Sequence, residues 1–177
     1  MYYTCKYGSK LGGITLASDG ENLTGLWFDG QKYFADNLPK QYEEQDLPVF
    51  AQAKRWLDIY FSGREPDFTP PLSMTGISSF RRRVWEIMLT IPYGRTSTYG
   101  EIAAQIAAET GNRVSAQAVG GAVGHNSISL IIPCHRVVGA SGNITGYAGG
   151  VDKKIALLKM EGADISQLFI PKKGTAL

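Results

Sequence analysis

The chain has 177 residues, of which 44% are hydrophobic and 19% are charged, as is usual for a soluble globular protein of one or two domains. No apolar run approaches the ~20 residues of a membrane-spanning helix, and the first residues lack the basic and apolar segments of a secretion signal. We therefore expect a cytoplasmic protein (nuclear if its source is eukaryotic) with no membrane partner.

The formal net charge of +2 is unevenly distributed. Residues 1–76 contain seven Lys/Arg and ten Asp/Glu, a net charge of −3, whereas residues 77–177 contain eleven and six, a net charge of +5. The basic half includes three consecutive arginines, Arg81 to Arg83. This excess favours a polyanionic partner for the C-terminal half, although solvated helix faces would explain it as well.

The N-terminal half predicts a small antiparallel sheet covered by one helix. Short strands are expected at 2–7, 12–18 and 23–28, because these runs are separated by Gly, Asp and Asn turn signals. Residues 49–63 predict a helix that ends at a glycine. Its helically spaced apolar residues are Phe50, Ala53, Trp56, Leu57 and Tyr60. Residues 64–78 hold three prolines and no periodicity, so they predict a linker.

The C-terminal half predicts mainly helices, at 78–94, 97–111, 115–124 and 151–163. The second and third are short and joined by a tight turn, which is typical of a helix-turn-helix, although many such hairpins bind nothing. The sequence therefore predicts an α+β protein with domains at 1–76 and 77–177.

The segment 128–133 predicts a short strand that leads to Cys134. A cysteine in this position is usually a buried apolar side chain, but His135 and Arg136 both favour thiolate over thiol, so a nucleophile is the alternative. Because successive strand residues point to opposite faces, His135 would reach Cys134 only through a water molecule or a turn. Glu161 is the candidate carboxylate behind the imidazole, although a surface glutamate at a helix end would look the same.

The cysteines and histidines do not predict a metal site. Cys5, Cys134, His125 and His135 have neither the number nor the spacing of zinc ligands. We expect two reduced thiols and no metal.

The segment 117–150, "QAVGGAVGHNSISLIIPCHRVVGASGNITGYAGG", with the later "LLKMEG", resembles the active-site region of the O6-alkylguanine-DNA alkyltransferases. In that family "PCHRV" is the acceptor motif, and the upstream "Y-x-E-I-A" and the downstream "GYAGG" accompany it. The resemblance covers roughly residues 79–163, and the N-terminal half matches only in size and strand-then-helix order.

The resemblance implies a ribonuclease-H-like N-terminal domain and a C-terminal domain with a winged helix-turn-helix variant. It also implies repair of double-stranded DNA by a monomer, without a cofactor. Each molecule would irreversibly move one methyl or other alkyl group from O6 of guanine, and possibly from O4 of thymine, to its own Cys134.

The resemblance assigns catalytic roles residue by residue. Cys134 is the alkyl acceptor, His135 the base that acts through water, and Glu161 the carboxylate behind it. Asn126 braces the active-site turns, and Tyr99 helps to extrude the base and protonates the leaving guanine. Without the resemblance, Asn126 would read as a turn residue and Tyr99 as a core aromatic.

The resemblance further implies that helix 115–124 enters the minor groove, where small residues permit close approach, and that the damaged base is flipped out. The expected DNA contacts are Arg113, Ala116, Gln117, Ala118, Gly120, Gly121 and Arg136. The expected walls of the base pocket are Val137, Ile144, Tyr147 and Ala148. Tyr147 would otherwise be a core aromatic. Gln117 is a departure, because the family often has an arginine there that fills the gap left by the flipped nucleotide, a role in which Arg113 would have to assist.

Two other functional classes stay open. A cysteine hydrolase would use the same nucleophile but would turn over, because water can attack an acyl thioester. A lesion-sensing relative would flip the base without repairing it, but in such proteins the acceptor cysteine is replaced.

Overall fold

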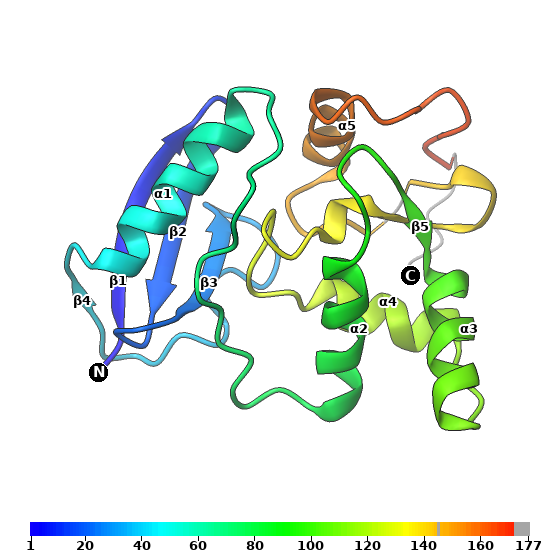
Figure 1. The fold of residues 1–177 in the computed structure, drawn as a ribbon, viewed down its shortest axis with the longest axis horizontal. Helices are drawn as coiled ribbons and strands as arrows, with labels where there is room; N and C mark the ends of the chain where they lie inside the picture. The colour runs from blue at the N-terminus through cyan, green and yellow to red at the C-terminus, as the bar shows by residue number, and fades with distance from the viewer. Residues whose placement is uncertain (145, 172–177) are drawn as a thin grey trace. The chain divides into compact units, whose positions relative to one another are not determined.

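The computed structural model describes residues 1–144 and 146–171, and the chain separates into two compact units (Figure 1). Unit 1 consists of Met1–Thr75 and Ser127–Ile131, and unit 2 consists of Gly76–Asn126 and the chain from Ile132 onward. A single boundary after Gly76 does not anticipate the short second segment of unit 1. The α+β class is confirmed, with a sheet-plus-helix unit followed by a mainly helical one.

Unit 1 contains a four-stranded sheet in the order β3-β2-β1-β4. The strands are β1 (Tyr3–Ser9), β2 (Gly12–Ser18), β3 (Leu23–Phe28) and β4 (Glu43–Glu44). The first three form the expected antiparallel meander, and β4 adds a short parallel edge beside β1 that the sequence did not predict. Two exposed glutamates carry no strand signal, so only their pairing with β1 reveals β4.

Helix α1 (Pro48–Phe61) packs against β1, β2 and β3 (Figure 1). Pro48 occupies the first turn, where a missing amide hydrogen costs nothing. All five apolar residues that predicted this helix are buried. Their spacing at three and four residues places them on the one face that meets the sheet.

The segment Ser127–Ile131 lies alongside β3 and pairs with it only briefly, so it does not form the predicted strand. The amide of Leu26 donates to the carbonyl of Ser127 at 2.8 Å, and the amide of Ser129 donates to the carbonyl of Leu26 at 2.9 Å. Only Ile128 makes a strand-like bridge, and Leu130 then adopts a left-handed φ of 69°. The chain therefore turns before Cys134, because a left-handed residue cannot continue a strand.

Unit 2 is built from helices α2 (Ser79–Leu89), α3 (Tyr99–Thr110), α4 (Ala116–Gly124) and α5 (Val151–Met160). Each of the first three begins at a residue whose hydroxyl accepts from a backbone amide, namely Ser78, Thr98 and Ser115. Helix α4 packs against α2 and α3, and Nε1 of Trp85 donates to the carbonyl of Ala122 at 2.9 Å. This bond fixes one face of α4 against α2.

A short 3-10 helix, η1 (Cys134–Arg136), begins with the candidate nucleophile. It is followed by β6 (Val137–Val138), which pairs in parallel with β5 (Ser97–Thr98), and by a second 3-10 helix, η2 (Ala140–Gly142). The expectation that Cys134 follows a strand is therefore corrected, because Cys134 to Arg136 form a 3-10 turn. Among the described residues, no helix has the length and apolarity to span a membrane.

Candidate active site

Cys134 lies at the start of η1 and is only 5% exposed. Burial raises the pKa of Tyr99 to about 12, and a negative charge on Cys134 adds to this shift. Burial likewise raises the pKa of Tyr147, again with a contribution from Cys134. Both phenols therefore keep their protons at neutral pH. The Tyr147 hydroxyl is buried and has no hydrogen-bond partner among the described residues.

Asn126 connects the end of α4 to the turn before Cys134. Its amide nitrogen Nδ2 donates to the carbonyl of Ile132 at 2.8 Å, and its backbone amide donates to Val123 at 3.1 Å. Both the side chain and the acceptor are buried. The turn before Cys134 is thus tied to the C-terminal end of α4. The bracing role of Asn126 in the reaction stays a prediction.

Glu161 is the C-cap residue of α5 and accepts hydrogen bonds from three residues. Nε2 of His135 lies 2.6 Å from Oε1, Nε of Arg136 donates to Oε2 at 2.9 Å, and the amide of Gly94 donates to Oε2 at 3.2 Å. Burial alone would raise the pKa of Glu161, but the bonds and charges of His135 and Arg136 lower it to about 2. The carboxylate is therefore ionised.

His135 is fully buried and keeps a neutral imidazole. Burial lowers its pKa, Glu161 opposes this, and the cations of Arg136 and Lys154 lower it further. An ionised carboxylate can only accept, so Nε2 carries the hydrogen and Nδ1 is the basic nitrogen of the ring. The pair can therefore take up a proton from a neighbouring group and stabilise the imidazolium that forms.

Arg136, an expected DNA contact, is engaged inside the protein. Its guanidinium donates to both oxygens of Glu161 and, through Nη1, to the carbonyl of Ile91 at 2.8 Å. The residue is only 9% exposed. These bonds orient Glu161 and hold the guanidinium inside the protein, which argues against a phosphate contact by Arg136.

The residues expected to wall the base pocket follow η1 in the chain. A charge on Cys134 contributes to the raised pKa of Tyr147. Val137 directly follows η1 and is fully buried. Ile144 is buried, and its amide donates to the carbonyl of Phe169 at 2.8 Å, so the C-terminal segment pairs with this loop. Ala148 is half-buried. Their role toward a base stays a prediction.

Helix α4 presents one exposed face of small and neutral residues. Gln117, Ala118 and Gly121 are exposed and Ala116 is half-buried, as a surface for DNA requires. Gly120 is buried against the other helices, so its expected DNA contact is corrected. Helical geometry explains this, because positions 117, 118 and 121 share a face that position 120 does not.

An apolar hollow of about 440 Å³ adjoins the start of α4. Its lining residues are Phe80, Arg113, Val114, Ser115 and Ala118. Arg113 is exposed there, so its predicted DNA contact is sterically open. The N-terminal turn of α4 contains no acidic residue that would repel a phosphate.

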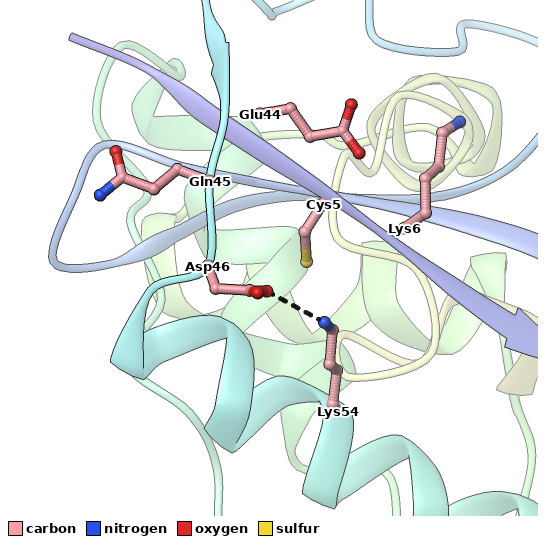
Figure 2. A pocket seen from close by; sticks show the side chains of 6 residues that line it. All are labelled: Cys5, Lys6, Glu44, Gln45, Asp46 and Lys54. Carbon is pink, nitrogen blue, oxygen red and sulfur yellow. Dashed lines mark hydrogen bonds and ion pairs between the residues drawn. The ribbon is translucent and has the colours of Figure 1, made fainter.

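Cys5 is one of the residues that line a second hollow, of about 280 Å³, in unit 1 (Figure 2). Lys54 from α1 pairs with Asp46 at 3.4 Å, on the side of β1 where the Cys5 sulfur lies. Burial raises the pKa of Cys5 to about 11, so this thiol stays protonated and is a poor nucleophile. In the described part of the chain, no group of three or more His, Cys, Asp or Glu side chains could hold a metal ion.

Sequence reasoning missed Lys154, a fully buried lysine on α5. The signal was present, because Lys154 is spaced by three, four and seven residues from Leu157, Leu158 and Glu161, all of which are buried. A lysine on an apolar helical stripe is unusual unless it is paired.

Comparison with known proteins gives matches over both units. The family model described as "6-O-methylguanine DNA methyltransferase, ribonuclease-like domain" matches residues 1–74, and its DNA binding domain matches residues 79–163. The chain is 45% identical over 153 residues to the methylated-DNA–protein-cysteine methyltransferase of Mycobacterium tuberculosis, covering 86% of this chain and 88% of that protein. It is 41% identical over 162 residues to the one from Haemophilus influenzae, covering 91% and 86%.

Solved structures agree with the sequence matches. A crystal structure of the Mycobacterium tuberculosis O6-methylguanine methyltransferase superposes with a TM-score of 0.78 at 42% identity, covering 98% of this chain and 97% of that one. A structure of Mycobacterium tuberculosis OGT in complex with DNA gives a TM-score of 0.76 at 43% identity, covering 91% and 92%.

Proposed function

Because the chain belongs to the 6-O-methylguanine DNA methyltransferase family, we propose that it repairs DNA by transferring the alkyl group on O6 of guanine to the sulfur of its own Cys134. The observation that carries the proposal is the buried pair of His135 and Glu161, 2.6 Å apart, next to a cysteine at the start of η1. This set supplies a nucleophile, a base and an orienting carboxylate.

We propose that the reaction begins when Nδ1 of His135 takes the Cys134 proton through a water molecule. The thiolate attacks the alkyl carbon in line, so the sulfur–carbon bond forms as the carbon–oxygen bond breaks. The electron pair stays on guanine, which receives a proton from Tyr99. The imidazolium then returns a proton to the Tyr99 phenolate through solvent, and Glu161 stabilises the charge on the imidazole throughout.

Tyr99 keeps its proton at neutral pH, as a proton donor to the leaving guanine must, although burial raises its pKa to about 12 and so makes it a weaker acid. The buried Tyr147 hydroxyl has its hydrogen-bonding capacity available for a flipped base. An alkyl thioether has no electrophilic carbonyl for water to attack, so each molecule acts once and needs no cofactor.

We further propose that a monomer binds double-stranded DNA through the exposed face of α4 in the minor groove. The small side chains of Ala118 and Gly121 allow this close approach. Gln117 would fill the gap left by the flipped nucleotide with a neutral amide, and Arg113 would supply the nearby positive charge. A protein that repairs genomic DNA must also act inside the cell, where that DNA is found.

Intact-mass spectrometry after incubation with duplex DNA containing O6-methylguanine tests the proposal. One added methyl group, mapped to Cys134 and absent from Cys134→Ser, is the expected result. Cys5→Ser is the matched control and should accept one methyl like the wild type. An unmodified mass, or continuing turnover of a small ester or amide, would refute the proposal and favour a cysteine hydrolase.

A further inference from the structure

Lys154 is held in place beside the turn that carries Cys134. Its side chain is fully buried, and its ammonium donates to the carbonyl of Val137 at 2.5 Å. Val137 is the C-cap residue of η1, and its own amide donates to the carbonyl of Cys134. Helix α5 packs directly on η1. The cation is therefore fixed at the far end of the same one-turn helix.

The ionisable groups near Lys154 differ in how far their charges are already compensated by other groups. Glu161 accepts from both His135 and Arg136, so its charge is compensated within that cluster. The other ionisable groups near the sulfur, Tyr99 and Tyr147, hold their protons at neutral pH. A negative charge on the Cys134 sulfur raises the pKa of Lys154, so a thiolate at Cys134 would stabilise the Lys154 ammonium.

Burial makes this ammonium costly to keep. It lowers the pKa of Lys154 to about 8, and the charge of Cys134 partly offsets that shift. A folded-state pKa below the usual value means that ionisation of Lys154 reduces stability at neutral pH. A methionine of similar length would avoid this cost, so the cation has a value other than stability.

We propose that Lys154 is a positioning residue for alkyl transfer, whose buried ammonium holds the Cys134 sulfur as a thiolate. This inference rests on the proposed function. Glu161 and His135 take the proton from the thiol, and Lys154 then stabilises the anion that is left, which is the reactive form of cysteine. The cation of Lys154 also lowers the pKa of His135, which favours the neutral imidazole before the reaction.

Thiolate absorbance in the DNA-free protein is the first test, in a Cys5→Ser background so that only Cys134 contributes. In Lys154→Met the thiolate fraction at neutral pH should fall at least about tenfold, which corresponds to the loss of one close charge interaction. Lys154→Arg keeps the cation and should retain most of the thiolate. Lys159→Met removes an exposed lysine from the same helix and should change nothing. An unchanged thiolate fraction in folded Lys154→Met overturns the proposal.

The second test needs no Lys154 variant, so it decides the question even if Lys154→Met does not fold. If the ammonium stabilises the thiolate, the thiolate stabilises the ammonium by the same free energy. Capping Cys134 with methyl methanethiosulfonate removes the anion, so the titration of the Lys154 side chain followed by NMR should move to lower pH. An identical titration before and after capping overturns the proposal.

These tests are separate from the test of function, because neither uses DNA. A protein that shows the Lys154 dependence but accepts no methyl from O6-methylguanine DNA would refute the proposed function and leave the ion pair established. A protein that accepts the methyl with no dependence on Lys154 would refute only this inference.

Discussion

Nε2 of His135 lies 2.6 Å from Oε1 of Glu161, and neither side chain is accessible to solvent. Arg136 donates to both oxygens of the same carboxylate. The buried cluster therefore combines one anion, one permanent cation and one neutral base. This composition avoids an uncompensated buried charge and leaves the imidazole free to gain a proton during the reaction.

We predict that Glu161→Gln slows alkyl transfer by about a hundredfold or more, because a neutral amide cannot stabilise the imidazolium that forms on His135. The variant also leaves the Arg136 guanidinium without its anion, which should lower the free energy of unfolding by about 3 kcal/mol. Single-turnover rates and urea denaturation measure the two effects. The control is Glu109→Gln, which loses an exposed pair with Arg83 and should leave both the rate and the free energy of unfolding nearly unchanged. A wild-type rate in Glu161→Gln would contradict the proposed relay.

Stability should fall as the pH is lowered from neutral. The folded-state pKa of His135 lies below its usual value, so stability is lost as pH falls from about 6.5, where the unfolded chain begins to bind the proton. The folded-state pKa of Glu161 is about 2, so its contribution is complete above about pH 5 and is lost as pH falls toward 2. Thermal unfolding across this range checks the sign, and a double variant of His135→Gln and Glu161→Gln should have a flatter profile.

Arg136 and Arg113 should behave oppositely in DNA binding. Arg136→Met should destabilise the fold by about 3 kcal/mol, because it strands a buried carboxylate, but should not alter the salt dependence of binding in the protein that remains folded. Arg113→Ala should leave stability nearly unchanged and reduce the slope of log affinity against log salt by about one. Titrations at several salt concentrations decide between them. A reduced slope in Arg136→Met would restore the DNA contact that the structure argues against.

Larger side chains on the exposed face of α4 should leave the protein folded but should weaken its binding of DNA. A Cβ atom at Gly121 meets no atom within 4 Å, so Gly121→Leu should fold and should stabilise α4 by about 0.5–1 kcal/mol. If this face enters the minor groove, the leucine should weaken binding of damaged DNA at least tenfold. Ala108→Leu, at an exposed position of α3, is the control for added bulk. Unchanged affinity in Gly121→Leu would move the DNA interface elsewhere.

Periodic segments were predictable from sequence, and contacts between distant segments were not. The stripe of Trp56 and Tyr60 defined α1 because spacing at four residues is a local property. The turn at Leu130 was missed because it follows a segment, Ser127 to Ser129, that pairs with Leu26 far away along the chain. Local pattern alone could not distinguish a buried strand from this paired loop.

The candidate site shows the same division. The motif "PCHRV" located Cys134 and His135, and the helix end located Glu161. The role of Arg136 could not be read from sequence, because it depends on a carboxylate 25 residues away along the chain. A cation beside a cysteine fits a DNA contact and a buried ion pair equally well, and only the fold decides which one forms.

The contact between the loop that carries Ile144 and the C-terminal segment yields the final prediction. Gly142 has a φ of 87°, and a Cβ atom there would lie 2.2 Å from the carbonyl oxygen of Gln167. Gly142→Ala must therefore displace backbone and should break the bonds that pair Phe169 with Gly142 and Ile144. The matched control is Gly63→Ala, whose φ of 84° carries the same backbone strain in open space.

Hydrogen exchange of the Ile144 and Phe169 amides should accelerate only in Gly142→Ala. Transfer should also slow in that variant, because this loop precedes Tyr147, a predicted wall of the base pocket whose pKa responds to the charge of Cys134. Equal exchange in both variants would mean that the pairing does not hold the loop.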